Sequence, residues 1–173
     1  LSNVDFEKPI ADRPTTRGFD YYFGTDVPNY PPYCFIENDR TVGIPAAPST
    51  PLFNLPGPML PEWKWVDIMP ELTRRAVKYV EDAAKSPDKP FFLYFPLTAP
   101  HFPIVPTPEF QGKSGAGLYG DFVAQVDWTV GQVLDALDRT GMAAGTLVVF
   151  TSDNGPEVAG EVGIGAYERI QKY

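Results

Sequence analysis

The run Phe91-Phe92-Leu93-Tyr94-Phe95 is followed later in the chain by a second apolar run, Thr146-Leu147-Val148-Val149-Phe150-Thr151. Neither run alternates between apolar and polar residues, which is typical of a strand buried on both faces. Between them, apolar residues recur at helical spacing and predict a helix over residues 118–139 that stops at Gly141. Strand, helix and strand form a βαβ unit, so we expect parallel strands joined by a right-handed crossover, and an α/β fold.

Another amphipathic helix is predicted directly before the first run. This helix is predicted to begin near Asp67, which can cap a helix, and to end at Ser86-Pro87. Pro70 fits the first turn of such a helix. Its apolar stripe consists of Leu72, Ala76, Val77, Val80, Ala83 and Ala84.

Residues 1–61 give little regular structure because prolines interrupt them throughout. They are rich in aromatic residues and too apolar for a disordered linker, so we interpret them as an ordered, winding loop region, with short extended pieces near Tyr33–Ile36. Residues 62–173 hold the helix-strand-helix-strand core. Two parallel strands do not make a stable sheet alone, and the chain starts without an initiator Met. We therefore expect residues 1–173 to be an internal segment, with several strands lying outside it.

Composition excludes some classes of function. The chain has 14 Lys and Arg against 22 Asp and Glu, a net charge of −8, which argues against nucleic-acid binding. A single cysteine, Cys34, excludes an internal disulfide and a cysteine-based zinc cluster. No apolar stretch is long enough to cross a bilayer, and no signal-peptide pattern is present.

Polar residues follow both predicted strands. His101 comes just after the first, and Asp153 and Asn154 come just after the second. Ligands of open α/β sheets bind at the carboxyl ends of the strands, so these side chains are expected at one edge. Oxygen donors suit Ca²⁺ or Mg²⁺, although two are too few for a calcium site. The alternatives are an ordinary Asn-Gly turn and a surface-loop histidine.

The remaining residues with reactive, aromatic or charged side chains are predicted to have structural roles. Cys34 has no basic neighbour to activate it and is expected to be a packed thiol. The aromatic pair around Lys64, Trp63 and Trp65, is interpreted as loop packing rather than a cation–π or sugar-stacking patch. Asp121 and Asp127 on the second helix are expected to be solvated or capping carboxylates.

Four segments resemble the type I sulfatases of the alkaline phosphatase superfamily, in matching order and spacing. They are Arg17-Gly18-Phe19-Asp20-Tyr21-Tyr22-Phe23-Gly24, Pro90 to Phe95 with Pro100-His101-Phe102-Pro103, Val126-Asp127-Trp128-Thr129-Val130-Gly131, and Thr146 to Pro156. The resemblance implies an alkaline-phosphatase-like large mixed sheet with helices on both faces, incomplete in this chain.

The resemblance also implies a chemistry, the hydrolysis of sulfate monoesters by a formylglycine nucleophile with Ca²⁺. Asp153 and Asn154 would be Ca²⁺ ligands, and His101 would contact the sulfate or the leaving oxygen. The substrate would be a sulfated glycan or an aryl sulfate. Enzymes of this kind are exported, periplasmic or extracellular, or lysosomal. The oligomeric state is left open.

The chain departs from the family pattern at both ends. The nucleophile motif Cys/Ser-x-Pro/Ala-x-Arg is absent, since Ser49-Thr50-Pro51 is followed by Leu52-Phe53. The paired aspartates and the later substrate-binding lysine are also absent, and Lys172 is assigned no role. We expect residues 1–173 to be the central part of a sulfatase catalytic domain that is inactive in isolation. The alternatives are a phosphatase or phosphonate hydrolase of the same superfamily, and a non-catalytic anion-binding paralogue.

Overall fold

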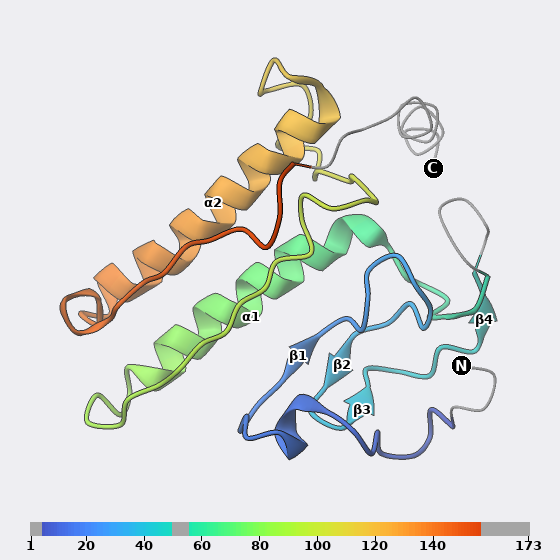
Figure 1. The fold of residues 1–173 in the computed structure, drawn as a ribbon, viewed down its shortest axis with the longest axis horizontal. Helices are drawn as coiled ribbons and strands as arrows, with labels where there is room; N and C mark the ends of the chain where they lie inside the picture. Colours follow the sequence, from blue (N-terminus) through green and yellow to red (C-terminus); the bar gives the residue numbers. More distant parts are fainter. Residues whose placement is uncertain (1–4, 50–55, 157–173) are drawn as a thin grey trace. The chain divides into compact units, whose positions relative to one another are not determined.

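The computed structural model describes residues 5–49 and 56–156 (Figure 1). These residues fall into two compact units, one ending at Trp65 and the other beginning at Val66. No helix in the described ranges is long and apolar enough to cross a membrane.

The first unit is built from very short strands. β1 (Phe23–Gly24), β2 (Ile36–Glu37) and β3 (Arg40–Thr41) form an antiparallel sheet in that order, and β4 (Ala47–Pro48) pairs antiparallel with β5 (Pro58–Met59). Asn38 turns the chain between β2 and β3 at a φ of 54°, a conformation that asparagine tolerates. Its side chain accepts a hydrogen bond from the Tyr22 N–H at 3.1 Å.

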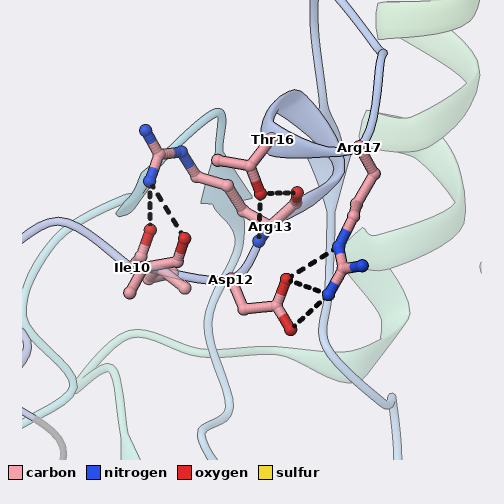
Figure 2. Close-up of polar contacts among 6 residues, drawn as sticks. Ile10, Asp12, Arg13, Thr16 and Arg17 are labelled. Atoms are coloured by element: carbon pink, nitrogen blue, oxygen red, sulfur yellow. Dashed lines mark hydrogen bonds and ion pairs between the residues drawn. The ribbon is translucent and has the colours of Figure 1, made fainter.

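Aromatic side chains fill this unit. The rings of Phe23 and Phe35 stack at 5.0 Å, and Trp63 meets Phe35 edge-on at 4.9 Å. Near the start of the unit, the short 3₁₀ helix η1 (Pro14–Thr16) is held by polar contacts of Arg13 and Thr16, beside a bidentate Arg17–Asp12 pair (Figure 2). In its described parts, the proline-rich region thus consists of turns, short strands and one 3₁₀ helix.

The second unit contains the two predicted helices. The 3₁₀ turn η2 (Trp65–Asp67) leads into α1 (Ile68–Ala83), and α2 spans Gly117–Arg139, followed by η3 (Ala143–Gly145). Asp67 stands at the N-cap of α1 but its side chain makes no capping hydrogen bond, so that detail of the prediction is wrong. Gly141 ends α2 as predicted, with a φ of 73°. Two hydrogen bonds form a Schellman motif there, Gly141 N–H to Asp138 O and Met142 N–H to Leu137 O.

The two helices pack against each other and run in the same direction. Val80, Ala136 and Leu137 form one apolar cluster near their C-terminal ends, and Met69 and Phe122 join a second near their N-terminal ends. A buried hydroxyl pair, Thr73 Oγ1 and Thr129 Oγ1 at 2.9 Å, links the helices between the clusters. Because Thr73 donates to the Met69 carbonyl, Thr129 is the donor in this pair.

The two predicted strands are extended segments, which we call the first ribbon (residues 91–95) and the second ribbon (residues 146–151). Both run back along the helices in the same direction, as predicted (Figure 1). Neither forms a β-ladder among the described residues. The prediction that both faces are buried is wrong: Phe92 is 74% exposed and Leu147 89%. The described chain supplies no neighbouring strand, so only one face of the first ribbon is covered, by the C-terminal cluster of α1 and α2.

The loop that follows the first ribbon is held by two buried polar side chains of α2. Asp121, only 1% exposed, accepts hydrogen bonds from the Gly112 N–H at 2.7 Å and the Ser114 N–H at 2.9 Å. Gln125, one turn further along α2, accepts from the Thr107 N–H at 2.9 Å. Asp121 is therefore a loop-binding carboxylate and not a solvated one, whereas Asp127 is exposed as expected.

These bonds make Asp121 sensitive to pH. Hydrogen bonds from Ser114, first from its side chain and then from its backbone, together with the Gly112 N–H, lower the pKa of Asp121. A carboxyl with a lowered pKa in the folded state stabilises that state above its unfolded pKa of about 3.9 and loses this contribution as the pH falls further.

We expect Asp121→Asn to lower the melting temperature of the protein at neutral pH. The melting temperature of the variant should also fall less steeply as the pH drops below about 4, because the neutral amide gains no proton on unfolding. Thermal melts between acidic and neutral pH measure both effects. Asp127→Asn, on the exposed side of the same helix, is the matched control and should leave the curve unchanged. Identical curves for the two variants would show that the Asp121 bonds do not stabilise the fold.

Candidate functional site

His101 lies in a loop fixed on both sides by buried apolar residues. Ala99 precedes it and Ile104 follows it, and both belong to the N-terminal cluster with Met69 and Phe122. The first ribbon is packed at its beginning against the C-terminal cluster, so the chain crosses the length of both helices before reaching His101. The imidazole itself is exposed.

The ring orientation of His101 follows from one contact. Its Nδ1 lies 2.6 Å from the carbonyl oxygen of Phe102. A carbonyl only accepts hydrogen bonds, so Nδ1 must carry the hydrogen in this arrangement. In the neutral ring this leaves Nε2 as an unprotonated acceptor, and in the charged ring Nε2 is a second donor. Nε2 is therefore the atom that His101 presents to a ligand.

Asp153 and Asn154 lie just after the second ribbon and are exposed. The Ser152 hydroxyl donates to the main-chain carbonyl of Asn154, which bends the chain at this point. The side-chain oxygens of Asp153 and Asn154 are thus accessible to a cation. Their chemistry, one carboxylate and one carboxamide oxygen, fits a hard cation such as Ca²⁺.

The arrangement brings His101 and the Asp153-Asn154 pair into one unit, after two ribbons that run the same way (Figure 1). It does not assemble a complete metal site: within residues 5–49 and 56–156, no group of three or more His, Cys, Asp or Glu side chains is placed to hold a metal ion. Asp153 and Asn154 can supply only part of a coordination shell. Two donors are fewer than the six to eight oxygen ligands that a calcium ion takes.

The other residues singled out by the sequence have structural roles. The Trp65 indole N–H donates to the Pro28 carbonyl at 3.2 Å and its ring contacts Tyr33, while Trp63 packs on Phe35. The two tryptophans therefore serve loop packing, as predicted. Cys34 is fully buried, and burial, with a smaller contribution from the Asp26 carboxylate, raises the pKa of its thiol to about 11.

Sequence reasoning missed the two buried polar residues of α2 that anchor the loop after His101. Asp121 and Gln125 are four residues apart and so share a helix face. They lie next to apolar positions, Phe122 and Val126, that point into the core. A polar residue on a helix is normally expected to face solvent. The position of Asp121 and Gln125 beside the apolar stripe was the one feature of the sequence that could have indicated their burial.

Comparison with known proteins identifies the family. The family model of the sulfatases matches residues 2–173, and the chain belongs to the sulfatase family. It is 39% identical over 108 residues to an N-acetylgalactosamine-6-O-sulfatase of Bacteroides thetaiotaomicron, covering 62% of this chain and 20% of that protein. It is 31% identical over 145 residues to the N-acetylgalactosamine-6-sulfatase of Mus musculus, covering 82% of this chain and 27% of that protein. The human arylsulfatase A is 36% identical over 109 residues, 61% of this chain and 20% of that enzyme.

A solved structure agrees with this assignment. A protein described with glycosaminoglycan metabolism by Bacteroides thetaiotaomicron superposes with a TM-score of 0.77 at 26% identity, over 95% of this chain and 42% of that one. The chain therefore spans less than half of the solved structure that it matches. The chain therefore carries an incomplete sulfatase fold.

Cys34 is expected to be inert as a nucleophile, because a thiol with a pKa of about 11 is almost wholly protonated at neutral pH. Titration with a disulfide reagent should label it slowly in the native protein and at once in denaturant. Rapid native labelling would contradict the buried position.

The tautomer of His101 can be measured directly, because it is the one histidine in the chain. Long-range ¹H–¹⁵N NMR of the neutral ring should show the hydrogen on Nδ1, as its bond to the Phe102 carbonyl requires. The denatured chain, in which this bond is absent, is the control. A hydrogen on Nε2 in the folded protein would contradict the orientation described above.

Proposed function

We propose that residues 1–173 are the central part of a sulfatase catalytic domain, and that the complete protein hydrolyses sulfate monoesters. The sulfatase match along residues 2–173 carries this proposal. Two of the relatives are named as sulfatases of a sulfated amino sugar, and the similar solved structure is described with glycosaminoglycan metabolism. A sulfated glycan is therefore the proposed substrate, with aryl sulfates as the second class.

Asp153 and Asn154 are proposed as Ca²⁺ ligands through their side-chain oxygens. Both side chains are exposed at the end of the second ribbon, and the oxygen-only donor set suits this ion. When bound, Ca²⁺ would supply positive charge beside the sulfate group. Asp153 and Asn154 hold and orient that charge, and further ligands are expected from parts of the protein beyond this segment.

His101 is proposed to act on the leaving group. Its Nδ1–H is held by the Phe102 carbonyl, so a charged ring points its second N–H, at Nε2, away from the backbone. That group can donate a hydrogen bond to a sulfate oxygen or a proton to the ester oxygen as the S–O bond breaks. The nucleophile, a formylglycine in enzymes of this kind, is expected outside the segment because the motif that carries it is absent.

The exposed ribbons support the proposal that the catalytic domain extends beyond this segment. Phe92 and Tyr94 on the first ribbon, and Leu147, Val149 and Phe150 on the second, are each more than half exposed. Burying a side chain of this size contributes about 1.5–3 kcal/mol, so such a surface favours cover by further strands and helices. The complete domain would then hold a large mixed sheet with helices on both faces.

The proposal is tested in the complete protein that contains this chain. We expect it to hydrolyse 4-nitrophenyl sulfate and sulfated sugars in preference to the matched phosphate esters.

His101→Ala should lower kcat by about 10²–10⁴-fold, the usual contribution of a general acid. Asp153→Ala should lower kcat/KM and raise the calcium concentration needed for activity. Asp127→Ala, an exposed carboxylate on α2, is the control and should have little effect.

Each outcome separates the alternatives. Preference for the phosphate ester would favour a phosphatase of the same superfamily. An unchanged calcium requirement and unchanged kcat/KM in Asp153→Ala would remove Asp153 from the metal site. Turnover of an aryl sulfate by residues 1–173 alone would contradict a nucleophile outside the segment.

A further inference from the structure

The Asn154-Gly155 step has the features of a reactive backbone site. Both residues are exposed, and they lie in a bend that follows the second ribbon. Within the described ranges, no hydrogen bond holds the side-chain amide of Asn154 or the N–H of Gly155; the bond made at Asn154 is to its main-chain carbonyl. A β-carbon placed on Gly155 would meet nothing within 4 Å, so the space around this residue is open.

These features allow a known reaction of the backbone. The main-chain nitrogen of Gly155 attacks the side-chain carbonyl carbon of Asn154, and a C–N bond forms as the amide C–N bond breaks and ammonia leaves. The resulting five-membered imide is opened by water at one of its two carbonyl groups, giving aspartate or isoaspartate. No oxidant or reductant is needed. Glycine permits the approach because it has no β-carbon and reaches backbone angles that other residues avoid.

We propose that Asn154 is a site of spontaneous deamidation in the metal-free protein, and that a cation held by the Asn154 side chain suppresses it. The second half rests on the proposed function, because it requires Asn154 to be a metal ligand. A carboxamide whose oxygen is fixed by a cation is no longer free to turn toward the Gly155 nitrogen.

Deamidation changes the site in two ways. The aspartate product places a second carboxylate directly beside Asp153, which replaces a neutral oxygen donor by a charged one. The isoaspartate product inserts a methylene group into the main chain and moves the donor oxygens. Either product alters the donor set proposed for Ca²⁺. Occupancy of the metal site thereby protects the chemical integrity of the site.

The chain contains its own controls. Asn29 is followed by Tyr30, whose N–H donates to the Val27 carbonyl at 3.1 Å. The Asn38 side chain accepts the Tyr22 N–H at 3.1 Å and precedes a bulkier residue, Asp39. A hydrogen bond thus holds the attacking nitrogen after Asn29 and the side-chain amide of Asn38. These two asparagines are expected to react far more slowly than Asn154.

Tryptic peptides separate these asparagines. Residues 140–169 form one peptide in which Asn154 is the one side-chain amide, and residues 18–40 form another that contains Asn29 and Asn38. Replacement of an amide by a carboxyl group is read as a mass increase of the peptide. The complete protein is incubated at neutral pH with a calcium chelator, with calcium, and in denaturant.

Without calcium, we expect the 140–169 peptide to gain mass at nearly the rate of the denatured protein, while the 18–40 peptide stays unchanged. With calcium at a hundred times its Kd, about 1% of sites are free, so the rate should fall about a hundredfold. In the Gly155→Ala variant, the 140–169 peptide should show little of this mass increase over the same incubation. A native, calcium-free rate far below the denatured rate would overturn the proposal.

The two parts of the proposal, the deamidation of Asn154 and its suppression by a cation, can be refuted separately. Deamidation that calcium does not slow would remove Asn154 from the metal site while leaving the reactive site established. Magnesium, added alone in a parallel arm, tests whether the protection is selective. Equal protection of the 18–40 peptide would show that calcium acts through general stability and would overturn the protective role of Asn154.

Discussion

The packing of α1 against α2 is the interaction on which the rest of the second unit depends. The two helices bury apolar clusters at both ends of their contact, and the first ribbon and its following loop touch first one cluster and then the other. Among the described residues, His101 is therefore placed by the helix pair, to which its loop is packed. The Thr73–Thr129 hydroxyl bond between the clusters fixes the lateral register of the helices, at a net contribution of about 1 kcal/mol.

Both helices could be predicted closely from the sequence because their signals are local. The apolar stripe of α1 and the Gly141 stop of α2 involve residues within a few turns of one another, and the Schellman bonds at Gly141 need no distant partner. The ribbons are different. Their extended course is set by their own residues, but a strand requires a neighbour, and the described residues supply none. Of the two-residue strands, the sequence indicated the extended chain near Tyr33–Ile36, where β2 begins and Tyr33 bridges Met59. The pairing of the strands was not predictable, because it depends on contacts between distant residues such as Phe35 and Trp63.

In the candidate site, too, the features set by local sequence were predictable and those set by distant contacts were not. The rule that ligands bind beyond strand ends selected His101, Asp153 and Asn154 from the sequence, since it needs only the order of apolar runs and polar residues. The partners of these residues were not predictable. The Phe102 carbonyl that orients His101 is a backbone group, common to every residue, and the anchoring role of Asp121 depends on a loop bending back onto α2.

Charge limits how such a site can work. The chain has a net charge of −8, and Asp153 is an acidic group beside the place proposed for an anionic ester. Between Lys89 and Arg139 the sequence offers a single cationic side chain, Lys113, so the segment that contains His101 supplies little positive charge of its own. The cation that we propose to be held by Asp153 and Asn154 would supply positive charge that residues 90–138 largely lack. If Asp153 and Asn154 hold a cation as proposed, the bare carboxylate of Asp153 would repel a sulfate ester, so the proposal implies that the metal binds first and the substrate second.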